Sequence, residues 1–226
     1  MDSNSKTARI AGILFIFATV TGIISVLFMD SKLETPIAAA NIASNQIQLL
    51  TAAFFITIMS FACAGIAIAL YPVLKKEHEG LAIGAVGFRI IEAVFHLISA
   101  IALIVLVKIS VEYTNAGSSV LFDFQPFSTI LKSLHDGTFN LGLMAFTLGA
   151  FMYYVIFFQS GLIPRWLSAW GIIGVILTFT LTVLILFNRN IPDAITGLFN
   201  FPIAIQEMVL AVWLIVKGFN QTAANE

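Results

Sequence analysis

Six long apolar stretches constrain this chain more than any other feature of its sequence. Each can cross a hydrocarbon core of about 30 Å, which takes about 20 residues of helix. The sequence therefore predicts an all-α bundle of six membrane-spanning helices in a single membrane domain over residues 1–226. The predicted spans are 8–29, 47–74, 81–107, 129–159, 163–187 and 201–219.

The composition agrees with a chain that lives in lipid. Charged residues make up 10% of the sequence, against about 25% in an ordinary soluble domain. The formal net charge is −1 and no long basic run occurs, which excludes nucleic acid as a partner. Cys63 stands alone in an apolar stretch, so neither a disulfide framework nor a cysteine metal cluster is expected, and we predict a buried small hydrophobe.

Proline agrees with these boundaries, because it interrupts helices. We expect no proline in the middle of a span; the six positions at span ends or in connectors are Pro36, Pro72, Pro126, Pro164, Pro192 and Pro202. Thr35 and Pro36 are expected to start a helix that runs without a break into the second span. The second long connector, around 108–128, is expected to lie along the membrane surface.

The orientation follows from lysine and arginine, which accumulate on the cytoplasmic side. With both termini inside, six basic residues lie on the inner side and four on the outer side. The inner set is Lys6, Arg9, Lys75, Lys76, Arg165 and Lys217, and the outer set is Lys32, Lys108, Lys132 and Arg189. The first span is too long for a signal peptide and no small-residue cleavage site follows it, so we expect a retained helix.

Three ionisable residues interrupt the third span, in the segment GFRIIEAVFH. Counted from the inner start of that span, Arg89 lies about 12 Å deep, Glu92 about 17 Å and His96 about 23 Å. The three positions fall within about 60° of arc on one helical face. Because a charged face directed at lipid is costly, we expect this stripe to face the interior of the bundle.

Two other spans carry polar residues to a similar level. The fourth brings His135 and Asp136 to a depth of about 10 Å from the outer side, and the sixth brings Glu207 to about the same depth. We therefore predict a polar cavity in the outer half of the membrane between the third, fourth and sixth spans, with Arg89 as its internal counter-ion. The candidate residues for binding a ligand or cation are Arg89, Glu92, His96, His135, Asp136, Asn140, Gln206 and Glu207.

The charges of this predicted site do not balance. Arg89 offsets one of Glu92, Asp136 and Glu207, which leaves two negative charges if both histidines are neutral. Lys132, one turn from Asp136, can neutralise one of them. Protonation or a bound cation must neutralise the remainder.

Several chemistries suit such a site. The leading hypothesis is a transporter or sensor that binds a cation or small polar ligand. One alternative is a metal-dependent, hydrolase-like membrane enzyme that holds Zn²⁺ or Fe. The candidate metal ligands are Glu92, His96, His135, Asp136 and Glu207. A third is a structural component whose Arg89–Glu92 and Lys132–Asp136 pairs only join helices.

Other classes are less favoured. Haem held by His96 and His135 has no attachment motif to support it. The sequence contains no Walker loop, dinucleotide fingerprint, HExxH motif or nucleophile elbow. The expected partners are the lipid bilayer and a small ligand or cation, and a homo-oligomer is left open.

Five motifs together resemble a known family: RIAGILF, ALYPVLKKEHEGLAIGAVGFRIIEAV, LHDGTFNLG, GLIPRWLSAWGIIG and FPIAIQEMVLAVWLIVKGF. They make nearly the whole chain similar to a bacterial multi-pass membrane family known only as domain of unknown function 4386 (DUF4386). The resemblance implies a bacterial plasma-membrane protein without an established activity, so no catalytic residue is carried over. Arg89, Glu92, Asp136 and Glu207 all lie within these motifs.

Overall fold

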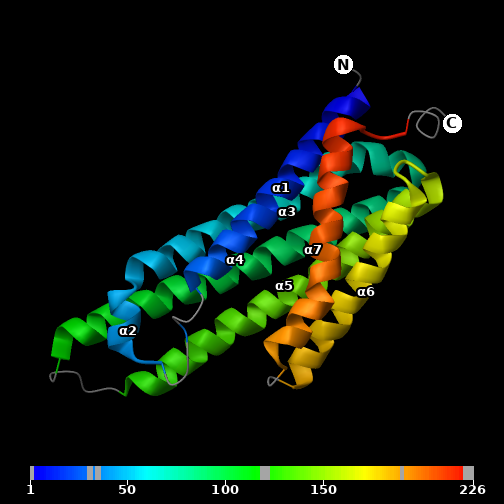
Figure 1. Ribbon diagram of the computed structural model, residues 1–226. Helices are drawn as coiled ribbons and strands as arrows, with labels where there is room; N and C mark the ends of the chain where they lie inside the picture. Colours follow the sequence, from blue (N-terminus) through cyan, green and yellow to red (C-terminus); the bar gives the residue numbers. More distant parts are fainter. Residues whose placement is uncertain (1–2, 30–32, 34–36, 118–122, 189–190, 221–226) are drawn as a thin grey trace.

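The computed structural model describes residues 3–29, 33, 37–117, 123–188 and 191–220, and the regular secondary structure of these residues is helical (Figure 1). Six helices are long and apolar enough to cross a membrane, which confirms the predicted number of spans. A short helix precedes the second of them. The helices are α1 (Ser3–Met29), α2 (Ala39–Ser44), α3 (Gln46–Glu77), α4 (Glu79–Ala116), α5 (Phe124–Ser160), α6 (Arg165–Phe187) and α7 (Asp193–Val216).

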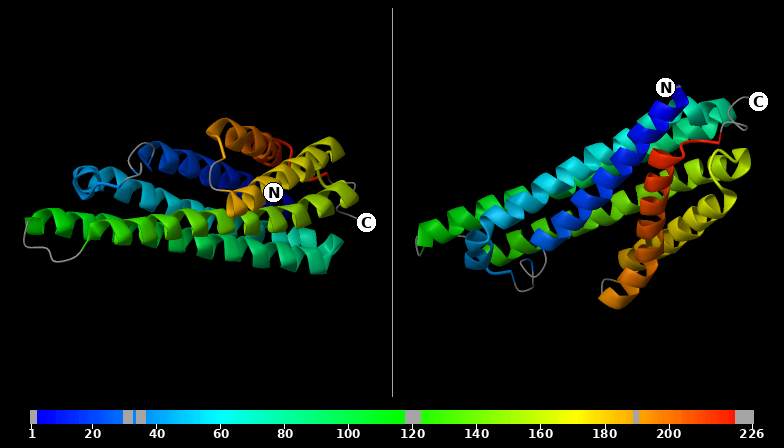
Figure 2. Two further views of the ribbon diagram at one scale, coloured as in Figure 1. Left: turned by 90° about the horizontal axis from the view of Figure 1, so that it is seen from below. Right: turned by 45° about the horizontal axis from the view of Figure 1, so that its top comes forward.

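The six long helices pack as a closed ring in the order of the chain. Each contacts the next, from α1 to α3, α4, α5, α6 and α7, and α7 contacts α1 again. α2 packs on α4, outside this ring. The two described chain ends lie at the same end of the bundle, as an even number of spans requires (Figures 1 and 2). Buried side chains from successive helices therefore converge on a shared interior.

Small residues set the distance between α4 and α5. A Cβ atom on Gly149 would lie 3.2 Å from the Ala85 carbonyl oxygen, and one on Gly84 would lie 2.7 Å from the Met152 sulfur. Lipid gives two apolar helices no hydrophobic reason to associate, so close backbone approach and good packing supply the attraction instead. These two glycines hold the polar face of α4 close against α5.

Several helices extend past the ends predicted from hydrophobicity. α4 continues beyond Val107 to Ala116, α5 begins at Phe124, and α7 begins at Asp193 instead of Phe201. The connector expected to lie along the membrane surface is therefore helical over most of its length. Residues 118–122 fall outside the described part of the chain. At 1.5 Å per residue α4 is about 57 Å long, which exceeds the thickness of a hydrocarbon core.

The prediction that no proline lies in the middle of a span is wrong at Pro202, because α7 begins earlier than predicted, whereas Pro72 lies near the end of its helix. Pro72 lies within α3 and Pro202 within α7. Membrane helices tolerate proline where neighbouring side chains satisfy the freed backbone groups. Beside Pro202, the Thr178 hydroxyl of α6 donates to the Phe199 carbonyl at 3.4 Å. Pro164 and Pro192 directly precede α6 and α7, as expected of proline at helix starts.

The predicted unbroken helix into the second span is interrupted at Asn45, between α2 and α3. The Asn45 amide donates to the Asn41 carbonyl at 2.8 Å and to the Asn41 side chain at 3.0 Å. Such local side-chain bonds compete with helix continuation. Four other residues used for start and orientation expectations, Lys32, Thr35, Pro36 and Arg189, lie outside the described residues.

Candidate functional site

The three ionisable residues of α4 face the interior of the bundle, as predicted. Arg89 is 1% exposed, and Glu92 and His96 are each 2% exposed. Their i, i+3, i+7 spacing places them on one side of the helix, while Ile90, Ile91 and Val94 occupy the exposed side. The charged stripe is thereby kept away from lipid.

Arg89 is held by contacts from three sides. Its Nη1 atom lies 3.0 Å from Glu92 Oε2, an ion pair without the alignment of a hydrogen bond. Its Nε atom donates to the Cys63 carbonyl of α3 at 3.2 Å. The guanidinium also lies over the Phe146 ring of α5, 5.0 Å from the ring centre, which suits a desolvated cation. Arg89 thus ties α4 to α3 and α5.

His96 has space made for it by a glycine. A Cβ atom on Gly142 of α5 would lie 2.6 Å from His96 Cδ2 and Nε2, so the imidazole fits only because this position has no side chain. The ring also lies 4.7 Å from the Phe139 ring, centre to centre. Neither ring nitrogen has a hydrogen-bond partner of good geometry among the described residues. A buried imidazole whose two nitrogens lack protein partners is unusual, and both nitrogens are free of competing protein hydrogen bonds.

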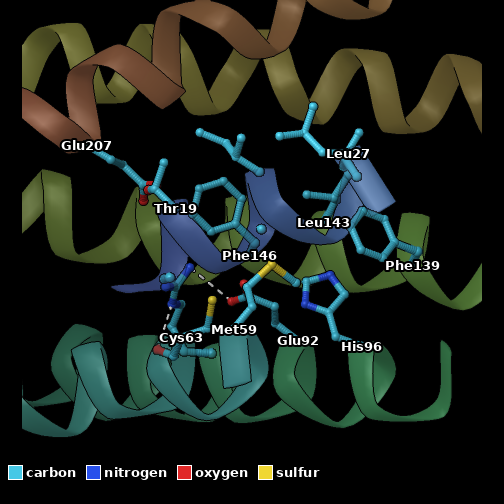
Figure 3. A pocket seen from close by; sticks show the side chains of 15 residues that line it. Thr19, Leu27, Met59, Cys63, Glu92, His96, Phe139, Leu143, Phe146 and Glu207 are labelled. Atoms are coloured by element: carbon cyan, nitrogen blue, oxygen red, sulfur yellow. Dashed lines mark hydrogen bonds and ion pairs between the residues drawn. The ribbon is translucent and has the colours of Figure 1, made fainter. Parts of the chain in front are cut away.

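A cavity of about 390 Å³ lies beside this stripe (Figure 3). Five helices supply its walls, and all its lining residues belong to membrane-spanning helices. Most of the lining is apolar, and its charged and imidazole groups come from α4 and α7. The lining residues are Ala18, Thr19, Gly22, Ile23, Val26, Leu27, Met59, Cys63, Arg89, Glu92, His96, Phe139, Leu143, Phe146 and Glu207.

Glu207 brings a second carboxyl group to this cavity. Figure 3 shows it reaching in from α7, on the wall opposite Glu92 and His96. Its Oε1 atom accepts a long hydrogen bond of 3.5 Å from the Tyr153 hydroxyl. Arg89 is the only lysine or arginine in the lining, so it faces two carboxyl groups. The cavity carries one negative charge in excess when both are ionised and His96 is neutral.

Two residues predicted to share the cavity lie elsewhere. His135 packs against Ser99 of α4, whose hydroxyl group lies 2.8 Å from His135 Nδ1 and donates to the His135 carbonyl at 3.0 Å. The Ser99 carbonyl oxygen also lies 3.0 Å from His135 Nδ1. Asp136 pairs with Lys132 at 2.6 Å, and its side chain is 52% exposed. The two positions are consecutive and so point about 100° apart on α5. They cannot both face the cavity.

Two amides predicted for the site join helices instead. The Asn140 amide donates to the Thr182 carbonyl of α6 at 3.0 Å. Gln206 accepts from the Tyr154 hydroxyl of α5 and donates to the Leu167 carbonyl of α6 at 3.0 Å. Gln206 is fully buried and links three helices beside Glu207. Of the eight candidates, the structure brings Arg89, Glu92, His96 and Glu207 together around the cavity.

The predicted set of metal ligands is divided by this arrangement. Glu92, His96 and Glu207 line the cavity, while His135 and Asp136 lie on other sides of α5. Across the described residues, no three histidine, cysteine, aspartate or glutamate side chains form a group suited to a metal ion. Structural and catalytic zinc sites generally need three or four protein ligands.

The α1 and α3 walls of the cavity were not predicted. α1 contributes Thr19, Gly22 and Ile23, and α3 contributes Met59 and Cys63. These residues are small, apolar or weakly polar, like residues that face lipid. Gly22 is the residue from which this wall could have been predicted, because a glycine within a span often marks a close approach of two helices. A Cβ atom on Gly22 would lie 3.1 Å from the Met59 sulfur.

Most of the chain matches a known protein family. The family described as "Domain of unknown function (DUF4386)" matches residues 10–218. The chain belongs to the DUF4386 family. This DUF4386 protein is a multi-pass membrane protein, and the matched region includes the whole candidate site. No match was found among curated proteins or among solved structures.

Proposed function

We propose that this protein binds a small cationic ligand in the cavity between α1, α3, α4, α5 and α7, as a transporter or a sensor. The supporting observation is the pairing of one buried arginine with two carboxyl groups, Glu92 and Glu207, around an accessible volume. An uncompensated charge inside a membrane costs several kcal/mol, about 2.5–3.5 by insertion scales. A bound cation removes that cost, and the partnerless nitrogens of His96 supply a further acceptor.

The purely structural alternative is supported by the Arg89–Glu92 ion pair itself. Such a pair needs no cavity, no second carboxyl group and no partnerless imidazole beside it. The cavity therefore favours ligand binding. The metal-enzyme alternative is not carried further, because the described residues contain no group of three metal ligands.

A binding measurement tests the proposal. Protein in lipid nanodiscs is titrated with tetramethylammonium and with tetraphenylphosphonium, and tetraphenylborate serves as an anion of matched shape. We expect at least one cation to bind, the borate not to bind above the level of empty nanodiscs, and Glu207→Gln to weaken the cation by about tenfold or more. Asp136→Asn, which removes an acid outside the cavity, should leave the affinity unchanged.

The proposal is wrong if neither cation shows saturable binding, or if the parent protein and Glu207→Gln bind the cation with equal affinity. Uptake of a bound cation into proteoliposomes then distinguishes a transporter from a sensor.

We further propose a plasma-membrane location with both chain ends in the cytoplasm, supported by the distribution of lysine and arginine.

A further inference from the structure

α1 and α7 touch at one end and diverge toward the other. A Cβ atom on Gly12 would lie 2.7 Å from the Ala211 carbonyl oxygen and from Ile215 Cγ1, so the two backbones are in close contact there. From that crossing, near the two chain ends, the helices separate along the rest of their length (Figures 1 and 2). The ring of helices is therefore tight at one end of this contact and loose at the other.

An apolar groove of about 850 Å³ runs along α7 at this divergence. Its lining residues are Thr19, Ile23, Trp166, Phe201, Ala204, Ile205, Met208, Val209, Val212, Trp213, Val216 and Lys217. Several face outward, among them Phe201, Val212 and Val216. A surface of this kind on a membrane-spanning helix faces acyl chains.

The groove and the central cavity share a boundary. Thr19 and Ile23 of α1 line both. Ile23 is 56% exposed, so it does not seal the cavity from the outer face of the bundle. All the lining residues of the cavity belong to membrane-spanning helices, and none of the described connector residues is among them, which favours an opening at the side of the bundle.

The lining also limits the chemistry of the occupant. Apolar side chains such as Leu27, Leu143 and Phe146 surround most of the volume, and Glu92 and Glu207 are the two acidic residues in its lining. A small hydrophilic cation would leave most of that surface unfilled. A molecule with an apolar body and one positive group would fill the volume and satisfy the charge.

From these contacts we infer that the ligand is a lipophilic cation that enters sideways from the bilayer, between the diverging parts of α1 and α7. This inference rests on the proposed cation-binding function. It adds the apolar body of the ligand and the lateral route past Thr19 and Ile23. Glu92 and Glu207 select the positive group of the ligand, and the groove along α7 is the route by which the ligand enters from the bilayer.

The first test compares two cations of equal charge in nanodiscs, with empty nanodiscs and Glu207→Gln as controls for partitioning. Tetraphenylphosphonium should bind at least about a hundredfold more tightly than tetramethylammonium, because it buries far more apolar surface. Equal or tighter binding of tetramethylammonium overturns this inference and leaves the proposed function intact. Failure of both cations to bind overturns the proposed function as well.

The second test places a bulky side chain at the lateral mouth. Ile23→Trp should slow association of tetraphenylphosphonium by about tenfold or more, since entry past this position is narrowed. Val20→Trp is the matched control, because Val20 lies one turn away on α1, is 45% exposed and lines neither space.

Ile205→Trp repeats the test from the α7 side of the groove, in case the α1 variant is poorly folded. Parental association rates in both mouth variants, or an equal slowing in Val20→Trp, would show that the cation does not enter between α1 and α7. Slowing confined to the mouth variants supports the lateral route.

Discussion

At the scale of single residues, the site is built around a cation that the protein already supplies. Arg89 contacts the Glu92 carboxyl group, the Cys63 carbonyl and the Phe146 ring, and it is almost completely buried. These contacts leave it little capacity for an added ligand. Its role is that of an internal counter-ion, and the less firmly held Glu207 is the group that remains for a second positive charge.

Removal of Arg89 should therefore destabilise the protein more than removal of Glu92. Arg89→Met leaves the buried Glu92 and the half-buried Glu207 carboxyl groups without a cation, which we expect to cost about 3–5 kcal/mol. Glu92→Met should cost less, because Glu207 still interacts with Arg89. The double variant Arg89→Met, Glu92→Met should recover part of the loss. Unfolding midpoints in detergent measure this order, and a larger loss in Glu92→Met would contradict it.

The space for His96 gives a second test at this scale. Gly142→Ala places a methyl group 2.6 Å from the imidazole, so the ring must shift, and we expect a loss of about 1–3 kcal/mol together with weaker cation binding. Gly137→Ala lies on the same helix, and its Cβ would meet nothing within 4 Å. That control should be stabilised by about 0.5–1 kcal/mol. Equal effects of the two substitutions would mean that Gly142 makes no special room for His96.

Part of this site could be predicted from the sequence. The spacing of Arg89, Glu92 and His96 fixes them on one helical face, and the cost of charge in lipid then directs that face inward. The rotation of α5 relative to α4 could not be predicted from the sequence, because it depends on packing at Gly84 and Gly149. The sequence therefore does not show that His135 and Asp136 turn away from the cavity. The apolar α1 and α3 walls carry no charge to identify them.

At the scale of helices, the number of spans follows from apolar length, but their ends do not. Lys108 and Glu112 make the end of α4 polar, yet the helix continues through them to Ala116. Hydrophobicity records what faces lipid, whereas a helix continues wherever its backbone bonds remain satisfied. α7 likewise continues through Pro202, where a hydroxyl on α6 helps to satisfy the backbone nearby.

The contact between α4 and α5 depends on a polar clamp as well as on glycine packing. Ser99→Ala removes the two contacts of the Ser99 hydroxyl with His135 across this interface, while the Ser99 carbonyl oxygen stays 3.0 Å from His135 Nδ1, and the loss should be about 0.5–2 kcal/mol. Ser110→Ala is the matched control, because Ser110 is also buried on α4 but donates to Leu106 within its own helix. Its loss should be below about 0.5 kcal/mol. Unfolding in detergent measures the loss of stability in both variants. Equal losses would mean that the Ser99–His135 contact does not stabilise the α4–α5 interface.

At the scale of the whole molecule, the ring of helices is asymmetric. Its close contact at Gly12 lies at the end that carries the chain termini, and its lateral groove follows the divergence of α1 and α7 (Figure 1). This geometry supports the proposed lateral entry, because Thr19 and Ile23 line both the cavity and the groove. The side of the membrane on which the mouth lies closer to the surface depends on orientation, which lysine and arginine determine.

Reporter fusions test that orientation. A reporter active only in the cytoplasm should work after Glu226 and in the α3–α4 turn at His78, and one active only outside the cell should work in the 118–122 connector. The opposite pattern would contradict the assignment.

Because the bias is six basic residues against four, replacement of Lys75 and Lys76 by glutamine removes it. We expect that double variant to insert in both orientations, whereas Lys108→Gln, which increases the bias, should keep the parental one.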